Sequence, residues 1–339
     1  MMRVLLGGIV VSLMAASFGC VPESKSTQAS GSEEASEPRQ RDEFAQDRGG
    51  DAKAVPVAFD AKRAMKYLEK ICDIGPRISG SEGMKKQREL VKKHFEDHGA
   101  KVRLQTFTVK QESQKDPVEM TNLIASWNPD RLQRVILCSH YDTRPIADQE
   151  ENRRKWNEPF ISANDGGSGV ALLMELAHHM KDLKTKVGVD FVLFDGEEYI
   201  FDPAPDHDRY FFGSEYFAES YRKEKPKQRY IAAVLLDMIG GKNANFPVEE
   251  NSWLSARALT RDLWQIADEL KCTSFDLNHE GPSVLDDHIA LNRVGIPACD
   301  IIDFSYKHWH RLSDVPANCS ADSLEQVAKV LSVWLQRVK

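Results

Sequence analysis

The sequence predicts an α/β protein, a three-layer α/β/α sandwich on a mixed, mainly parallel sheet. Three short apolar runs, residues 135–139, 191–194 and 231–236, lack the polar alternation of a half-exposed strand. Runs of this kind are typical of strands covered on both faces. Segments with helical periodicity separate them, and this alternation of strand and helix indicates the α/β class.

The other elements are predicted from caps and periodicity. Asp60 is expected to cap a helix that runs to Cys72, and a second helix runs from about residue 82 to 98 and is closed by Gly99. Residues 102–109 and 120–126 form an antiparallel pair of strands near the start of the domain. Further helices are expected over residues 166–181, 214–222, 252–271 and 321 to the C-terminus, with a last strand over 298–302.

Length and composition favour one large folded domain over two. The chain has 339 residues, of which 41% are hydrophobic and 29% charged, so residues 56–339 can bury a single core as one catalytic domain. The formal net charge of −7 gives no basic footprint for nucleic acid. Nucleic-acid binding is therefore not expected.

Residues 1–20 are predicted to be a lipoprotein signal peptide. Arg3 precedes an apolar stretch over residues 4–18, which is too short to span a bilayer but suits a secretory signal. The stretch ends in a segment that resembles a bacterial lipobox, so Cys20 is expected to be lipidated. Ser17 stands where a lipobox usually has leucine, and ordinary cleavage nearby is the alternative. The prediction places the protein at the bacterial cell envelope, anchored by lipid on the periplasmic or extracellular face.

Residues 21–55 are predicted to be a disordered tether. They are rich in Ser, Glu, Gln, Lys and Arg and carry too few apolar side chains to offset the entropy of ordering. Five cysteines remain beyond Cys20, an odd number with no Cys-x-x-Cys spacing. This argues against a disulfide framework and against a thiolate metal site, although one bridge stays open.

Each apolar run ends in side chains that bind metals. His140 and Asp142 end the first, Glu197 and Glu198 the second, and Asp237 the third. Ligands of α/β sheets bind at the carboxyl ends of the strands, so we expect these groups to meet in one cleft.

Asp165, in a glycine-rich turn, and His310 complete the ligand set. Four or five carboxylates in one pocket repel one another by several kcal/mol, which predicts a divalent cation. The mixture of imidazole and carboxylate favours zinc over magnesium or calcium. Asp142 is expected to orient His140. Because adjacent side chains point in different directions, one glutamate of the 197–198 pair can bind metal while the other shuttles protons.

The ordered motifs resemble those of the co-catalytic zinc aminopeptidases and their relatives, the animal-type glutaminyl-peptide cyclotransferases. The matching segments are Ser139–Asp142, Asn164–Asp165, Asp195–Glu198, Leu236–Gly240 and Trp309–His310. The resemblance implies zinc bound by Asp165, Glu198 and His310, with Glu197 as the general acid/base. A second metal, as in the peptidases, would use His140 and Asp237 and share Asp165, so the resemblance allows one or two zinc ions.

Three features resemble the cyclases more than the peptidases. Residues 285–289 resemble the segment that supplies an extra carboxylate near Glu197, which we assign to Asp287. Trp309 resembles the tryptophan that walls the pocket for a glutamine side chain, and the link over residues 199–212 has cyclase length. In the other direction, the turn over residues 164–169 resembles that of the peptidases.

The cyclase resemblance implies a reaction on peptide or protein N-termini. An N-terminal glutamine would become pyroglutamate with release of ammonia, and Asp237 and Asp287 would hold the transferring groups. The alternatives are a zinc aminopeptidase, which would use the same groups, and an inactive binding protein with the same fold. Outside this site, His178 and His179 end a predicted helix and are interpreted as surface or capping residues.

Overall fold

The computed structural model describes residues 54–204 and 207–339. The predicted signal peptide, Cys20 and nearly all of the predicted tether lie outside these residues. All described residues fall in one compact unit.

A six-stranded sheet forms the centre of this unit, in the order β1-β2-β4-β3-β5-β8. The four strands β4, β3, β5 and β8 are parallel, and β1 and β2 add two antiparallel pairings at one edge. The sheet is thus mixed and mainly parallel, as predicted. The strands are β1 (Lys101–Val109), β2 (Val118–Trp127), β3 (Gln133–His140), β4 (Gly188–Phe194), β5 (Arg229–Asp237) and β8 (Ala298–Ile302).

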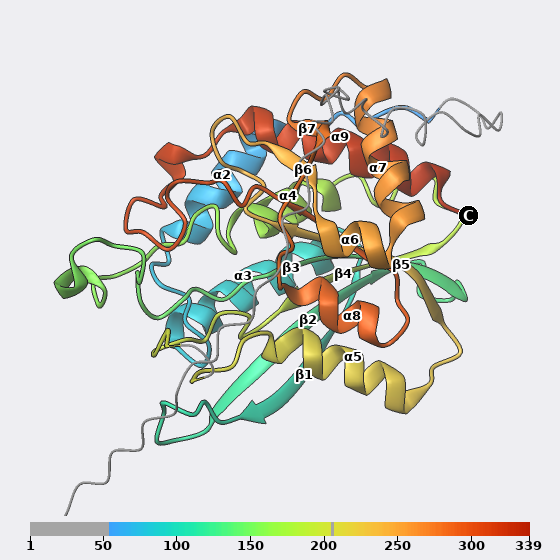
Figure 1. Cartoon of the computed structure of the whole chain (residues 1–339). Coiled ribbons are helices and arrows are strands. Elements are labelled where there is room, and N and C mark those ends of the chain that lie inside the picture. The colour runs from blue at the N-terminus through green and yellow to red at the C-terminus, as the bar shows by residue number, and fades with distance from the viewer. Residues whose placement is uncertain (1–53, 205–206) are drawn as a thin grey trace, which may run out of the picture. The chain divides into compact units, whose positions relative to one another are not determined.

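Helices cover both faces of the sheet, which confirms the three-layer prediction (Figure 1). One face packs against α2 (Ala61–Cys72), α3 (Glu82–Asp97), α4 (Ser168–Ala177), α7 (Arg257–Glu269) and α9 (Ala321–Arg337). The other face packs against α5 (Phe212–Glu224) and α8 (Asp287–Arg293). Phe191 and Val192, neighbours in β4, belong to opposite cores, and the apolar run has no alternation because both faces are buried.

Helix starts follow the predicted caps. The Asp60 carboxylate accepts a hydrogen bond from the Arg63 amide (2.9 Å), so α2 begins where expected. The helix predicted over 252–271 is instead two, α6 (Glu250–Ser255) and α7, which meet at Ala256. The sequence analysis also missed β6 (Phe246–Val248), β7 (Phe275–Glu280) and α8, all too short for a periodic signal. Two 3₁₀ turns, Arg153–Lys155 and Pro316–Asn318, complete the described elements.

Cys72, Cys138, Cys272, Cys299 and Cys319 are all buried free thiols, so the five cysteines of the described part form no bridge. Within residues 54–204 and 207–339, no helix has both the length and the apolar character needed to cross a bilayer.

Candidate active site

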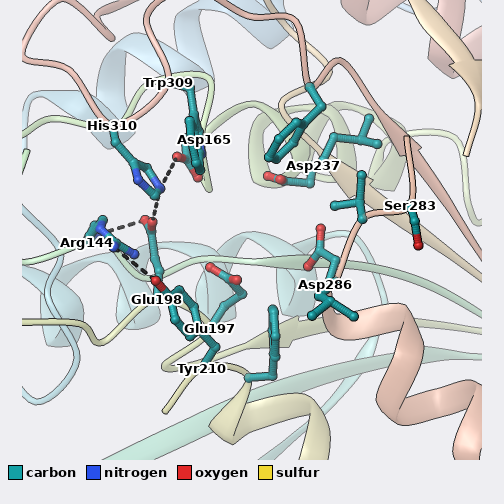
Figure 2. Close-up of a pocket in the computed structure, with 15 residues that line it drawn as sticks. Arg144, Asp165, Glu197, Glu198, Tyr210, Asp237, Ser283, Asp286, Trp309 and His310 are labelled. Carbon is teal, nitrogen blue, oxygen red and sulfur yellow. Dashed lines mark hydrogen bonds and ion pairs between the residues drawn. The ribbon is translucent and has the colours of Figure 1, made fainter. Parts of the chain in front are cut away.

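The strand ends bring the predicted ligands together in one pocket. His140 is the last residue of β3 and Asp237 the last of β5, while the acidic turn at residues 195–198 follows β4 directly. The pocket has a volume of about 320 Å³. Figure 2 shows its wall, which consists of Arg144, Asp165, Glu197, Glu198, Tyr210, Phe211, Asp237, Ser283, Val284, Leu285, Asp286, Ile302, Phe304, Trp309 and His310.

Asp165, Glu198 and His310 form the first group of metal-type ligands. His310 Nε2 lies 3.1 Å from Glu198 Oε2 and 3.5 Å from Asp165 Oδ2. All three side chains are buried, and Asp165 Oδ2 accepts no hydrogen bond from any residue that the structure describes. A buried carboxylate oxygen without a donor is unfavourable unless a cation binds it. These residues therefore fit a metal ion, and one imidazole with two carboxylates suits zinc.

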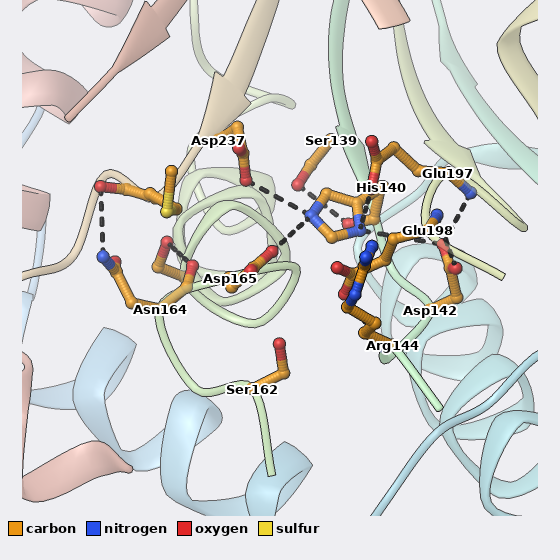
Figure 3. Close-up of polar contacts among 12 residues, drawn as sticks. Ser139, His140, Asp142, Arg144, Ser162, Asn164, Asp165, Glu197, Glu198 and Asp237 are labelled. Atoms are coloured by element: carbon orange, nitrogen blue, oxygen red, sulfur yellow. Dashed lines mark hydrogen bonds and ion pairs between the residues drawn. The ribbon is translucent and has the colours of Figure 1, made fainter. Parts of the chain in front are cut away.

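His140, Asp165 and Asp237 form a second group that shares Asp165. His140 Nε2 lies 3.1 Å from Asp165 Oδ1 and 3.2 Å from Asp237 Oδ1. Figure 3 shows the imidazole between these two carboxylates on one side and Asp142 and Glu197 on the other. The ligand types and their shared aspartate are those expected for a two-metal centre.

Asp142 holds the acidic turn as well as facing His140. Its two carboxylate oxygens accept hydrogen bonds from the amides of Glu197 (3.1 Å) and Glu198 (3.2 Å). His140 Nδ1 is farther away, 3.6 Å from Asp142 Oδ1. The hydrogen bonds of Asp142 therefore hold the turn that carries both glutamates, and its role toward His140 stays a prediction.

Asp314 holds the glycine-rich turn, and the sequence analysis missed it. Its carboxylate accepts hydrogen bonds from the amides of Asn164 (2.9 Å) and Asp165 (3.1 Å). The next residue, Gly166, has φ +70°, and a Cβ there would lie 2.7 Å from both the Asp142 carbonyl oxygen and His140 Cε1. Only glycine lets this turn pack against His140.

Asp148 orients His310 and was also missed. Asp148 Oδ1 lies 3.0 Å from His310 Nδ1, and its Oδ2 accepts a 2.8 Å hydrogen bond from Arg144 Nη2. The Arg144 amide in turn donates to Glu198 Oε1 (2.8 Å). Carboxylate partners of this kind fix the tautomer and direction of metal-binding imidazoles. Asp148 and Asp314 belong to no motif at a strand end, so only the fold identifies them.

Several backbone positions around the pocket are strained. His310, Met238, Phe211 and Ser162 have φ values of 51°, 49°, 63° and 52°. Non-glycine residues rarely adopt this left-handed region, and such positions often occur at functional sites. His310 and Met238, which follows Asp237, thus combine this backbone strain with the placement of a candidate metal ligand.

The two adjacent glutamates have different surroundings. The Glu198 side chain is 2% exposed and faces His310, whereas the Glu197 side chain is 14% exposed and faces the pocket. Burial, reinforced by the nearby carboxylates of Glu198 and Asp286, raises the pKa of Glu197 well above its usual value. A carboxyl with this environment suits proton transfer.

Asp286, rather than Asp287, supplies the pocket carboxylate. Asp286 caps α8 by accepting a hydrogen bond from the Asp287 amide (2.6 Å), and its side chain lines the pocket near Asp237 (Figure 2). Asp287 does not line the pocket but is fully buried against Ser214 of α5. The expectation for Asp287 is therefore corrected by one position, because consecutive residues at a helix start point in different directions.

Trp309 lies in the pocket wall, as expected. Its ring stacks on His310, with centroids 4.1 Å apart, and contacts Phe304 at 5.0 Å. Val284, Leu285 and Ile302 extend the apolar side of the wall. The pocket thus combines an acidic, metal-type floor with an apolar wall.

Comparison with known proteins agrees with this geometry. Residues 122–335 match the profile described as Peptidase family M28. The chain belongs to this family. A crystal structure of Fimbriiglobus ruber glutaminyl cyclase is 53% identical, with a TM-score of 0.83, over 87% of this chain and 100% of that one.

Two further similar proteins are more distant in sequence. A Zn-dependent exopeptidase from Parabacteroides distasonis has a TM-score of 0.76 and 28% identity, over 83% of this chain and 99% of that chain. A glutaminyl-peptide cyclotransferase from Gloydius blomhoffii is 24% identical over 288 residues, 76% of each chain. The predicted fold and the resemblance to the zinc exopeptidase superfamily are confirmed.

Proposed function

We propose that this M28 protein is a zinc-dependent glutaminyl-peptide cyclotransferase, which converts the N-terminal glutamine of peptides or proteins to pyroglutamate. The observation that carries the proposal is the pocket itself: Glu197 lies between the Asp165, Glu198 and His310 group and Asp286, opposite the apolar wall at Trp309. The 53% identity to a glutaminyl cyclase supports it.

Asp165, Glu198 and His310 would hold the zinc ion, and Asp148 would keep His310 in the binding orientation. When bound there, zinc supplies a Lewis acid for the γ-carboxamide oxygen of the glutamine. Asp165 is shared with His140 and Asp237, so the ligand set accommodates one ion or two. We propose at least one.

Glu197 would move the proton that the reaction must transfer. As the α-amine nitrogen of the substrate bonds to the γ-carboxamide carbon, Glu197 accepts a proton from that amine. It then gives the proton to the amide nitrogen, and the carbon–nitrogen bond breaks to release ammonia. Burial is the main cause that raises the pKa of Glu197, so this carboxyl holds a transferred proton more readily than an exposed glutamate does.

Asp286 and Asp237 would hold the substrate amine. Both line the pocket, and burial is the largest cause that raises the pKa of each. A carboxyl that carries a proton can donate a hydrogen bond, while its ionised partner accepts one from the amine. Trp309 would position the glutamine side chain against the floor of the pocket. Asp286 thereby takes the role first assigned to Asp287.

A zinc aminopeptidase is the second candidate. The intact His140, Asp165 and Asp237 group, with contacts of 3.1 and 3.2 Å, favours it, because a two-metal site suits hydrolysis of a peptide bond by water. Glu197 would then activate the water. The two candidates differ in the attacking nucleophile, not in the protein groups.

Mass spectrometry of a peptide panel separates the candidates. Peptides that begin with Gln, Leu, Ala or Met are incubated with the zinc-loaded protein. Loss of about 17 mass units from the Gln peptides alone corresponds to expelled ammonia and supports the cyclase. Stepwise removal of N-terminal residues supports the peptidase instead. Unchanged peptides throughout support the inactive binding protein.

Trp309→Ala tests the pocket once cyclisation is seen. We expect this variant to lose most of its cyclase activity while keeping its zinc, because Trp309 contacts His310 without being a ligand. A variant that cyclises like the wild type would contradict the assignment of the wall.

We also propose that the protein is a lipoprotein of the bacterial cell envelope, attached through Cys20. The support is the apolar stretch that ends at Gly19-Cys20. Cys20→Ala should move the protein from the membrane fraction to the soluble fraction. A wild-type protein that is soluble and begins downstream of Cys20 would contradict the anchor.

A further inference from the structure

Three histidines meet where α3 and α4 pack together, away from the pocket. His94 lies in the last turn of α3, His98 follows the last residue of α3, and His178 follows the last residue of α4. One nitrogen from each ring lies within 4.8 Å of the others. Helix α4 begins at Ser168, just after the turn that holds Asp165, and its ten residues span about 15 Å. The cluster therefore lies at the opposite end of this helix from the active site.

The spacing of two of the rings suits a shared metal ion. His98 Nε2 and His178 Nδ1 lie 3.1 Å apart, and their ring centroids are separated by 4.0 Å. Zinc binds imidazole nitrogen at about 2.0–2.1 Å, so two ligands at a tetrahedral angle are about 3.3 Å apart. A small adjustment of the side chains would admit an ion between them. The His94 ring, 4.3 Å from that of His98, stands beside this point.

In each ring, one nitrogen already has an oxygen partner. His94 Nε2 lies 2.7 Å from the Met174 carbonyl oxygen, and His98 Nδ1 lies 2.7 Å from the carbonyl oxygen of His94. His178 Nε2 lies 2.7 Å from the hydroxyl of Tyr67. Metal-binding histidines almost always donate the second N–H to such an oxygen, which fixes the tautomer. With these three nitrogens donating, the second nitrogen of each ring is left as an acceptor for a cation: His94 Nδ1, His98 Nε2 and His178 Nδ1.

Without a metal ion, the same contacts form a chain of hydrogen bonds. The Tyr67 hydroxyl would donate to His178 Nε2, and His178 Nδ1 would donate to His98 Nε2. A metal ion would take the place of the proton on His178 Nδ1. His178 Nε2 would then carry the proton and donate to the Tyr67 hydroxyl. Burial, the largest cause, lowers the pKa of both His94 and His178, that of His94 to about 4, so these imidazoles are neutral at pH 7. Neutral imidazole is the form that binds metals.

We propose that His94, His98 and His178 form a separate transition-metal site, the tri-histidine site, which takes Zn²⁺ or another divalent ion that favours imidazole. All three side chains are half-buried, so water can complete the coordination sphere. With three nitrogen donors and no carboxylate in the group, the site suits zinc, nickel or copper and not magnesium or calcium. The ion would link α3 to α4.

Metal stoichiometry tests the site. The purified full-length protein is dialysed against buffered Zn²⁺ and its zinc content is measured by elemental analysis. His98→Phe and His178→Phe, which keep an aromatic ring in the stack, should each bind one zinc ion fewer per chain than the wild type. His179→Gln is the matched control, because His179 is adjacent in sequence but faces Glu175 at 3.6 Å. Equal zinc content in all four proteins would overturn the proposal.

A measurement on the wild type covers the case in which a variant misfolds. Crystals of the wild-type protein equilibrated with Zn²⁺ are examined by anomalous diffraction at the zinc edge. A peak among the three imidazoles is the expected result. No peak there, with zinc present at the Asp165 group, would show that the histidines form only the hydrogen-bonded chain. This result does not depend on which reaction the active site catalyses.

Discussion

Glu197 and Glu198 show how neighbouring residues take different tasks. The backbone amides of both residues donate to the Asp142 carboxylate, which fixes the turn that carries them. Glu198 then points toward His310, while Glu197 points into the pocket. The direction of each side chain, more than its chemistry, therefore separates the surroundings of the two carboxylates.

Glu197→Gln should remove turnover and leave the metal in place. General acid–base catalysis contributes about 10²- to 10⁴-fold, so we expect kcat on Gln peptides to fall by at least about 100-fold. Zinc content, measured alongside kcat, should match the wild type. Glu198→Gln is the paired control and should lose zinc as well as activity. A Glu197→Gln protein with near wild-type kcat would exclude the proton-transfer role.

Asp286→Asn and Asp287→Asn test the corrected assignment. Asp286 lines the pocket, whereas Asp287 is buried behind it. We expect Asp286→Asn to lower kcat/KM by about 10- to 100-fold, the loss of one charged hydrogen-bonding group near the reacting atoms. Asp287→Asn should change kcat/KM less than Asp286→Asn. The reverse order, in proteins with equal unfolding temperatures, would restore the assignment to Asp287.

At the scale of elements, Glu249 joins the start of α6 to the segment that carries Asp286. Its Oε2 accepts hydrogen bonds from the Ser252 amide (2.6 Å) and hydroxyl (2.7 Å), and its Oε1 accepts one from the Val284 amide (2.9 Å). His288 Nε2 of α8 lies 3.4 Å from Oε2. One buried carboxylate thus positions a pocket wall through three elements.

Glu249 should make the free energy of unfolding depend on pH between about 4.5 and 2. Burial alone would raise its pKa, but His288, Ser252 and the Val284 amide outweigh burial and lower the pKa from 4.5 to about 2. Because the folded pKa is depressed, the stabilisation is present above pH 4.5 and is lost as the pH falls from 4.5 toward 2. The full contribution is on the order of 2–3 kcal/mol.

Denaturant unfolding at several pH values checks this expectation. The experiment uses metal-free protein in chelator, so that release of an ion does not add to the slope. Glu249→Gln should be less stable at pH 7 and show a shallower loss of stability between pH 5 and 2. Parallel curves for the wild type and Glu249→Gln would contradict the shift.

For the whole molecule, the acidic floor of the pocket is the feature that most needs compensating positive charge. Asp165, Glu197, Glu198, Asp237 and Asp286 all line one cavity at the carboxyl edge of the sheet. Like charges at this density oppose folding unless protons or a cation offset them. A cation bound at this floor would therefore stabilise the whole domain.

Removing the metal should lower both activity and unfolding temperature. A ligand that binds only the folded state at 1,000 times its dissociation constant stabilises by about 4 kcal/mol. We expect chelation to abolish turnover and to lower the unfolding temperature by several degrees, with both restored by added zinc. Asp165→Asn, which alters both ligand groups, should respond much less to chelator in calorimetry. Full activity of protein shown to be metal-free would contradict zinc dependence.

The sequence by itself determined the strands of the central sheet, most of the long helices and the candidate ligands at the strand ends. Apolar runs such as residues 191–194 are typical of buried strands, and a side chain that directly follows such a strand lies at the carboxyl edge of a parallel sheet. The positions of His140, the Glu197–Glu198 pair and Asp237 at this edge were predictable for this local reason, whereas the choice between the two glutamates came from the family resemblance. Asp60 likewise marked a helix start through its own side chain.

Only the tertiary structure decided which residues support those ligands. Asp148 and Asp314 act across long stretches of chain, on His310 and on the turn at Asp165, and no local pattern marks them. The choice of Asp286 over Asp287 depends on where α8 begins, and the meeting of His178 with α3 depends on how two helices pack. Local patterns fix where an element lies in the chain, whereas contacts between distant segments depend on the packing of the whole sheet and its helices.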